Sequence, residues 1–255
     1  MSIPFRYSTI QTYLKCPQLY KLRHIDGLSD GSERNADLRF GTVMHLAIQD
    51  LFEGGDGLTV FSVYWATVME SLDYGRLGWD DLNHIGRRLI EIFRDEHMSK
   101  FSAFSLELKQ EQQLGKHWYS GTVDFLGEMK GVGSVVDWKT SAYPYDAYKI
   151  RCNEQMHGYA YLSSGYMQAE GIPLGIEQLV YGVAIKDPKN PRWQFKVESL
   201  DSRKHQNAID NIESICDKIS EDTEAGKFHK NASSCVVGKN VCPFFERCHG
   251  GQEDK

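Results

Sequence analysis

Two acids and a lysine interrupt an otherwise apolar stretch near the middle of the chain. The segment GTVDFLGEMKGVGSVVDWKTS, residues 121 to 141, carries Asp124, Asp137 and Lys139 among residues that suit a buried sheet. Strands that needed only to pack would be better served by valine and phenylalanine, because a carboxylate or an ammonium is costly to remove from water. These three side chains are therefore the first candidates for chemistry.

Their spacing places the two acids side by side in a predicted hairpin. Side chains two apart on a strand share a face, so Asp137 lies beside Lys139. If the chain turns tightly at Lys130 and Gly131, the register puts Asp124 directly across from Asp137, with Cβ atoms about 4.5 to 5.5 Å apart. Like charges at that distance destabilise a sheet, so a cation should lie between them.

A divalent metal ion would satisfy this requirement. Carboxylate oxygens are the ligands that Mg²⁺ and Mn²⁺ prefer. Lys139 could position or deprotonate a water beside the ion, or stabilise negative charge on a phosphate. The alternative is an ion-pair ladder on a solvated sheet face, which this short pattern taken alone would favour.

The periodicity of the sequence predicts the elements that hold this hairpin. Residues 1 to 100 read as helical, and the stripe DLRFGTVMHLAIQDLF repeats apolar residues at spacings of three and four. From about residue 104 the period changes to two, which predicts three consecutive antiparallel strands up to 141 and two more within 176 to 200. A helix is expected over NEQMHGYAYLSSGYMQ, and another over 201 to 226.

This order of elements predicts an α/β fold built on one central mixed sheet. In the helical part, a first helix should begin at a Ser8 cap and end or kink at Pro17. Two more helices should cover 58 to 72 and 79 to 100.

Composition narrows the class of protein. The chain has 255 residues, 41% hydrophobic and 25% charged, so we expect one globular domain. It should comprise a helical N-terminal part (1–100), a catalytic sheet core (101–200) and a C-terminal helix with a cysteine-rich tail (201–255). Without a membrane-length apolar run or a signal-peptide core, a cytoplasmic protein without a membrane partner is expected. A net charge of −6 argues against a surface that coats nucleic acid throughout, although a local basic groove is compatible with it.

In their order and spacing these patterns resemble the PD-(D/E)XK nuclease superfamily, and within it the RecB- and AddB-type exonucleases. GTVMHLAIQ resembles the family's helix with a histidine metal ligand, here His45. GTVDF and VVDWKT resemble the strands that carry two acidic ligands and the catalytic lysine, here Asp124, Asp137 and Lys139. The resemblance implies a restriction-endonuclease-like core, with helices flanking a central mixed sheet. It also implies the main-chain carbonyl of Trp138 as a further metal ligand.

Three other polar residues are candidates for the site. QMHGY resembles the family's helix motif, in which Gln155 and Tyr159 line the site and contact DNA or hold the lysine. Being four apart, the two could equally form an ordinary half-buried pair on one helix face. Glu111, on the first strand, is either an outer-shell or metal-site carboxylate or a surface charge.

Cysteines near both ends of the chain form a second pattern. YLKCPQLYKL and CPFFERC resemble the motifs that enclose an iron–sulfur cluster in the AddB-like and CRISPR-associated branches. The resemblance implies a structural [4Fe–4S] cluster on Cys16, Cys235, Cys242 and Cys248, with structural Zn²⁺ as the alternative. The spacing from Cys235 to Cys242 departs from the family pattern, so Cys216 is an alternative ligand. Plain free thiols are the simplest reading of the tail.

The resemblance implies metal-dependent hydrolysis of DNA phosphodiester bonds with Mg²⁺ or Mn²⁺. The RecB-type branch implies an exonuclease that acts on single strands or DNA ends in recombination or repair, with a recombination or helicase protein as a possible partner. A structure-specific endonuclease or nickase on the same site is one alternative. A non-catalytic DNA-end-binding recombination partner is another.

Basic and aromatic side chains could form a track for the DNA strand. The basic candidates are Lys149, Arg151, Lys186, Lys189 and Arg192, and the aromatic ones are Tyr13, Tyr20, Tyr143 and Tyr145. A solvated turn explains the basic cluster as well, and core packing explains most of the tyrosines.

Overall fold

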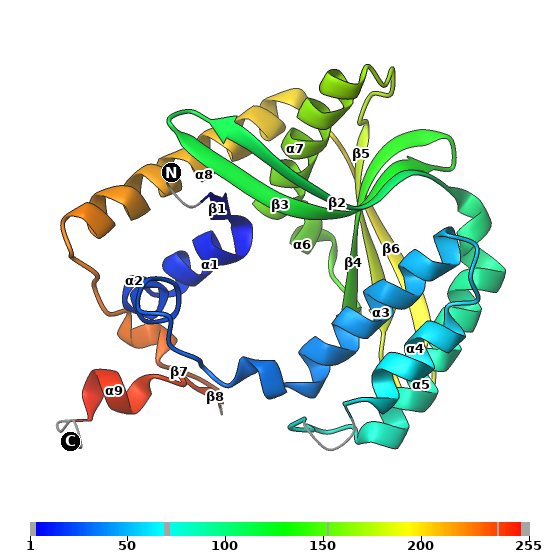
Figure 1. Cartoon of the computed structure of the whole chain (residues 1–255), viewed down its shortest axis with the longest axis horizontal. Coiled ribbons are helices and arrows are strands. Elements are labelled where there is room, and N and C mark those ends of the chain that lie inside the picture. The colour runs from blue at the N-terminus through cyan, green and yellow to red at the C-terminus, as the bar shows by residue number, and fades with distance from the viewer. Residues whose placement is uncertain (1–3, 69–71, 152, 239, 251–255) are drawn as a thin grey trace.

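The computed structural model describes residues 4–68, 72–151, 153–238 and 240–250. Cys152, expected to be a small buried residue, lies outside these ranges. The six strands of the main sheet follow the order β1-β3-β4-β5-β6, and β2 pairs with β3. Because β4 runs parallel to β5 but antiparallel to β3, the sheet is mixed, and the predicted α/β fold with a central mixed sheet is confirmed (Figure 1).

The strands fall where the alternating pattern predicts them. Their bounds are β1 Phe5–Arg6, β2 Phe101–Leu114, β3 His117–Met129, β4 Val132–Ser141, β5 Gln178–Ile185 and β6 Arg192–Ser199. A short hairpin of β7 Val236–Val237 and β8 Asn240–Val241 lies outside this sheet. The β1 strand was not expected, since two residues are too few to show a period.

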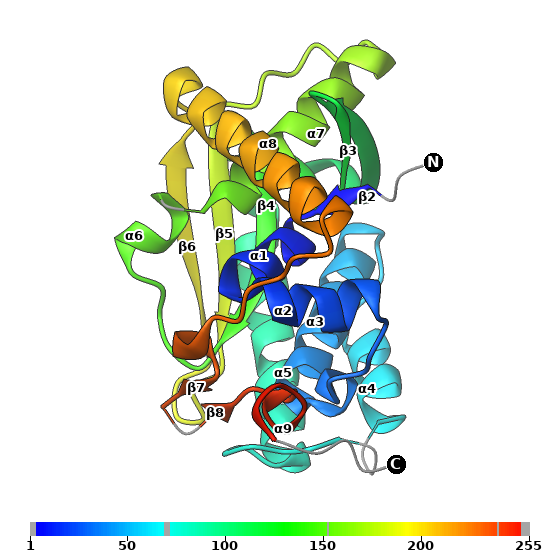
Figure 2. The same cartoon turned by 90° about the vertical axis from the view of Figure 1, so that its left-hand side faces the viewer.

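The helices cover both faces of the sheet. Their bounds are α1 Tyr7–Lys15, α2 Pro17–Tyr20, α3 Ala36–Phe52, α4 Leu58–Ala66, α5 Trp79–Ile92, α6 Ala147–Arg151, α7 Glu154–Glu170, α8 Ser202–Glu224 and α9 Phe245–His249. Helices α3, α4 and α5 lie on one face, and α7 with α8 on the other (Figures 1 and 2). Of the described residues, no helix is long and apolar enough to cross a membrane.

Short irregular helical turns link or extend these helices. They comprise the π-helices Lys21–Ile25 and Phe93–His97 and the 3₁₀ turns Ser32–Arg34, Met98–Lys100 and Ala232–Ser234. The continuation of α5 through two of them confirms the helix expected over 79 to 100.

Two helix boundaries differ from the sequence expectation. The first helix begins at Tyr7 rather than at a Ser8 cap, because the side chain of Thr9 reaches back and accepts from the backbone N–H of Arg6. It ends at Lys15 and α2 starts at Pro17, as expected of a proline, which cannot donate within a helix. Helix α4 ends at Ala66, short of the expected 72.

The apolar stripe of α3 anchors one side of the site. All its predicted core residues are buried: Phe40, Val43, Met44, Ala47, Ile48 and Leu51. They pack with α4, α5 and the sheet residues Phe125, Val136 and Trp138. The opposite sheet face, with Val135, packs on α7. Because Val135 shares its face with Asp137 and Lys139, β4 presents its polar residues toward the α7 side, as the period-two reading predicts.

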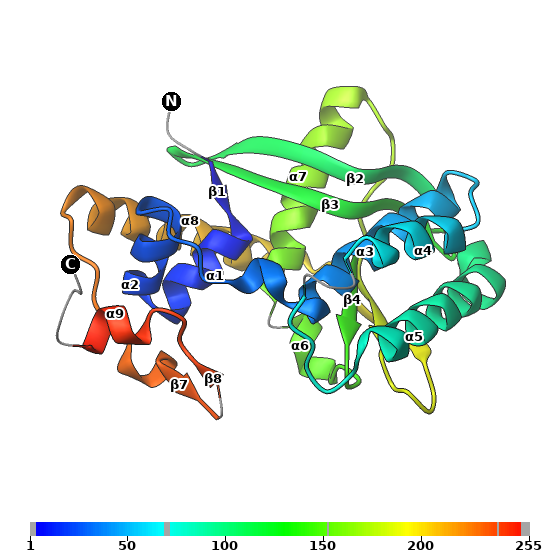
Figure 3. The same ribbon diagram turned by 60° about the horizontal axis from the view of Figure 1, so that its bottom comes forward.

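The first helices and the C-terminal tail lie together beside the sheet. Figures 1 and 3 both show α9 and the β7–β8 hairpin next to α1 and α2. Cys16, Leu19 and Leu22 pack there against Phe244 in a small apolar cluster of their own. The backbone N–H of Gln18 also donates to the carbonyl of His229 at 3.1 Å.

Candidate active site and cysteine cluster

The turn between β3 and β4 sets the register of the two acids. Its residues, 130 and 131, have φ values of 56° and 75°. Positive φ at both central residues is typical of a type I′ hairpin turn. Cross-strand pairing runs from this turn to the pair of Phe125 and Val136. Asp124 and Asp137 are the next positions in this register.

Asp124 lies where β3 and β4 separate. Strand β2 occupies one edge of β3, so β1 and β4 share the other, β1 at residues 119 and 120 and β4 from residue 125 onward. Asp124 falls in the gap between them. Its Oδ2 accepts a hydrogen bond from the backbone N–H of Trp138 at 2.8 Å. A side chain therefore ties β4 to β3 where the ladder of backbone hydrogen bonds has stopped.

Asp137 and Lys139 form an ion pair on one face of β4. Asp137 is 1% exposed, and its two oxygens lie 2.9 and 2.7 Å from the ammonium of Lys139. Burial alone would lower the pKa of Lys139, but the charge and hydrogen bond of Asp137, together with the charge of Asp124, raise it. The lysine therefore carries its positive charge into the site.

His45 faces two carboxylates across the groove. Its Nδ1 lies 3.7 Å from Glu107 and 3.6 Å from Asp124, and one ligand atom of each of the three residues lies within 4.8 Å of the others. Its Nε2 donates to the carbonyl oxygen of Trp138 at 2.7 Å. When an ion displaces the proton from Nδ1, this hydrogen bond keeps the remaining proton on Nε2 and leaves the Nδ1 lone pair for the metal.

The charges of this group call for a cation. Burial, and then repulsion from Asp137, raise the pKa of Asp124 to about 7. Burial lowers the pKa of His45, yet Glu107, Asp124 and Asp137 together raise it to about 9. Carboxylate oxygens with one imidazole nitrogen suit Mn²⁺ or Mg²⁺, so the residues present fit the divalent ion that the sequence predicts.

Glu107 is the site residue that sequence reasoning missed. It lies on β2 with a φ of 47°, a left-handed conformation that is rare for a residue other than glycine. Glu111, which the sequence leaves open as a site carboxylate or a surface charge, is exposed and lines a separate hollow with Arg6 and Lys109. This position favours the surface charge. Both acids lie on the same strand, and nothing in its alternation distinguishes them.

Gln155 and Tyr159 lie together on α7, which Asn153 caps by accepting from the backbone N–H of Gln155. The Gln155 amide donates to the Tyr159 hydroxyl at 2.8 Å. Burial, followed by the charges of Asp137 and Asp124, raises the pKa of the Tyr159 hydroxyl. A Cβ on Gly121 would lie 3.2 Å from the Tyr159 ring, so the glycine of GTVDF lets β3 approach α7 closely.

An open groove of about 850 Å³ gives access to the site. His45, Glu107, Lys139 and Thr140 are among the residues that line it. Below the groove, the Trp138 ring packs against several aromatic rings, with Phe93 at 5.3 Å and Phe101 at 5.6 Å between centroids. This packing holds the backbone of β4 rigidly beside the reactive side chains.

Four cysteines from the two ends of the chain line one small cavity. They are Cys16, Cys235, Cys242 and Cys248, and the walls between them include Leu19, Leu22 and Phe244. The backbone N–H of Asn231 donates to Cys16 Sγ at 3.3 Å. The alternative ligand Cys216 is fully buried in another cluster with Tyr119 and Ile212, which excludes it from this group.

A mixed sheet flanked by helices, with acids and a lysine on a central hairpin, defines a restriction-endonuclease-like fold. The chain belongs to the PD-(D/E)XK nuclease superfamily, whose sequence profile matches residues 4–249. The members of this superfamily use divalent metals, which agrees with the group of His45, Glu107 and Asp124.

One of two similar solved structures supports the fold. A protein from Eubacterium rectale named "Putative exonuclease" has a TM-score of 0.57 and 14% sequence identity, over 97% of this chain and 93% of that one. SSO0001 aligns with a TM-score of 0.34 and 15% identity, over 84% of this chain and 86% of that one. Among curated proteins, none matches the chain.

Proposed function

We propose that the protein is a Mg²⁺- or Mn²⁺-dependent DNA exonuclease of the RecB and AddB type, acting on single strands or DNA ends. The observation that carries this proposal is the group of His45, Glu107 and Asp124, whose ligand atoms lie within 4.8 Å of one another. It opens into a groove beside the ion pair of Asp137 and Lys139. An ammonium next to a cation site can orient an attacking water and stabilise the negative charge of a phosphate.

The chain's own groups divide the work of hydrolysis. Nδ1 of His45 and the carboxylates of Glu107, Asp124 and Asp137 would hold the ion. When bound, it would lower the pKa of a water and offset the charge of the phosphate. The ammonium of Lys139 orients that water and offsets charge as it develops on the phosphate. Asp137 holds the ammonium in place, while Trp138 fixes the tautomer of His45 through its carbonyl.

Degradation of end-labelled DNA tests this function. We expect digestion with Mg²⁺ or Mn²⁺ and none with EDTA. Asp137→Asn and Lys139→Met should each lower the rate by about 10² to 10⁴, because each removes a group that acts on the reacting atoms. Lys116→Met, at the exposed far end of the β2–β3 hairpin, should leave the rate unchanged. Undiminished digestion by Lys139→Met would overturn the mechanism, and cutting of circular single-stranded DNA would reassign the enzyme as an endonuclease.

We also propose that Cys16, Cys235, Cys242 and Cys248, which line one cavity, hold a structural [4Fe–4S] cluster. The leucine and phenylalanine walls of the cavity would shield such a cluster from water. Structural Zn²⁺ on the same four thiolates is the alternative.

A further inference from the structure

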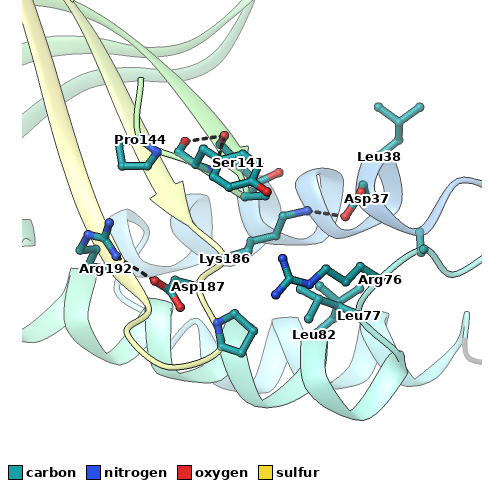
Figure 4. Close-up of a pocket in the computed structure, with 16 residues that line it drawn as sticks. Asp37, Leu38, Arg76, Leu77, Leu82, Ser141, Pro144, Lys186, Asp187 and Arg192 are labelled. Atoms are coloured by element: carbon teal, nitrogen blue, oxygen red, sulfur yellow. Dashed lines mark hydrogen bonds and ion pairs between the residues drawn. The ribbon is translucent and has the colours of Figure 1, made fainter. Parts of the chain in front are cut away.

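A second hollow continues the groove past the end of β4. This distal pocket has a volume of about 650 Å³ and lies between the start of α3, residues 75–77 and the turn from β5 to β6 (Figure 4). Asp37, Leu38 and Thr140 line both the distal pocket and the active-site groove. A DNA strand with one phosphate beside Lys139 can therefore continue into the distal pocket without leaving the surface.

One basic side chain of the distal pocket has no acidic partner among the described residues. Lys186 pairs with Asp37, and Arg192 lies 3.5 Å from Asp187, so both acids have partners. Arg76 has neither a hydrogen bond nor an ion pair within residues 4–68, 72–151, 153–238 and 240–250. Figure 4 shows its guanidinium directed into the pocket. A free guanidinium in a concave site favours an anion, phosphate above all.

Lys186 supplies a second cation to the distal pocket, paired with Asp37, which lines both hollows. Its side chain is 5% exposed, whereas that of its partner Asp37 is 68% exposed. The ammonium also lies 5.3 Å from the centre of the Phe40 ring. The lysine is therefore fixed in place while its acidic partner is free to turn toward water, so an arriving phosphate can take the place of the carboxylate.

The remaining walls suit a base. Leu77, Leu82, Pro144 and Pro188 provide apolar surface, and the side chain of Tyr143 is 70% exposed at the same pocket. A free aromatic ring stacks on any unpaired base, because every base has a π face. The volume lies within the range of pockets that hold a ligand the size of a nucleotide.

We infer that the distal pocket binds the nucleotide that follows the scissile phosphate in a single strand. Arg76 pairs with the phosphate of this nucleotide, and Tyr143 stacks on its base. The inference rests on the proposed nuclease function and assigns the path that the substrate takes from the site. Arg76 and Tyr143 are binding residues in this scheme, distant from the reacting atoms.

Binding of a fluorescein-labelled 12-nucleotide oligothymidylate to the full chain tests the inference, by anisotropy in EDTA over a series of salt concentrations. Arg76→Ala should weaken binding about three- to tenfold and reduce the slope of log K against log salt by about 0.7, the value for one lost phosphate contact on a single strand. Tyr143→Ala should weaken binding about tenfold, and Tyr143→Phe should restore it. Arg203→Ala, at an exposed arginine on α8, is the matched control.

Four outcomes separate the possibilities. Loss of affinity and slope in Arg76→Ala with an unchanged Arg203→Ala supports the distal pocket. Equal losses in both arginine variants indicate general electrostatic attraction and overturn it. An Arg76→Ala protein that binds like the wild type, while the wild type degrades DNA with Mn²⁺, overturns the pocket and leaves the nuclease function standing. A wild-type protein that neither binds nor degrades DNA would contradict both the distal pocket and the nuclease function.

Discussion

At the scale of single residues, the site depends on the candidate metal ligands and equally on the hydrogen bonds that orient them. The Trp138 carbonyl accepts from His45 Nε2 and so directs Nδ1 toward the acids, while the Trp138 N–H holds Asp124. One peptide segment thus orients two candidate metal ligands. Such contacts fix the tautomer and direction of a ligand and alter metal affinity when they are lost.

Loss of Glu107 should weaken metal binding. Glu107→Gln keeps the size of the side chain but removes one negative oxygen from the group within 4.8 Å. We expect Mn²⁺ affinity to fall about 10- to 100-fold, the range seen when groups around a metal are lost, as measured by calorimetric titration. Glu111→Gln, on the same strand but exposed, should bind Mn²⁺ like the wild type. Equal affinities for all three proteins would remove Glu107 from the site.

Sequence and structure agree at this scale where the period of a strand decides the outcome. The shared face of Asp137 and Lys139 follows from a spacing of two, and the structure shows them paired. Glu107 could have been found from the register of the β2–β3 hairpin. A two-residue turn at Gly115 and Lys116 pairs Leu106 with Phe125 and Leu108 with Val123, so Glu107 lies opposite Asp124. The left-handed backbone of Glu107 leaves no mark in the local pattern.

At the scale of elements, the β3–β4 hairpin determines which side chains meet. Lys130 and Gly131 both take positive φ, and pairing follows from there to Phe125 and Val136. A shift of one residue would turn Asp137 to the opposite face of the sheet. The Lys-Gly pair was recognisable in the sequence as a turn, although asparagine is the residue that the first position of this turn prefers.

Substitutions in this turn should change stability in opposite directions. Lys130→Asn should raise the free energy of unfolding by about 0.5 to 1 kcal/mol, because asparagine tolerates the left-handed conformation. Gly131→Val should lower it by about 1 to 2 kcal/mol or more. Urea unfolding followed by tryptophan fluorescence measures both. Lys130→Ala also removes the lysine side chain, but alanine does not favour the left-handed conformation. If Lys130→Ala raised the free energy of unfolding as much as Lys130→Asn, the explanation would be contradicted.

At the scale of the whole molecule, the cysteine cavity joins the first helices to the tail. Cys16 lies on the link between α1 and α2, and its three partners lie at or beyond residue 235. The sequence revealed the cysteines but could not choose between Cys216 and Cys235, because that choice depends on where α8 packs. Cys216 faces the core under α8, and Cys235 follows the helix into the cavity.

Removing one ligand should therefore loosen both ends of the chain together. Protein purified without oxygen should be brown and contain about four iron atoms per chain if all four thiolates hold a [4Fe–4S] cluster. Cys242→Ser should lose the iron and melt more than about 5 °C lower. Cys216→Ala should keep its iron, since that thiol lies in another cluster. A colourless wild-type protein with stoichiometric zinc would show that the four thiolates bind Zn²⁺ and no iron–sulfur cluster.

The hydrogen bonds between the two ends also set the order in which the protein can be completed. Asn231 donates to the carbonyl of Lys15 at 2.9 Å, and Ser234 donates to the same oxygen at 2.7 Å. During translation α1 leaves the ribosome long before Asn231 and Ser234 are synthesised. The carbonyl of Lys15 therefore gains these two donors late, and the contact of α1 with the tail forms after the sheet and α8 are already available for packing.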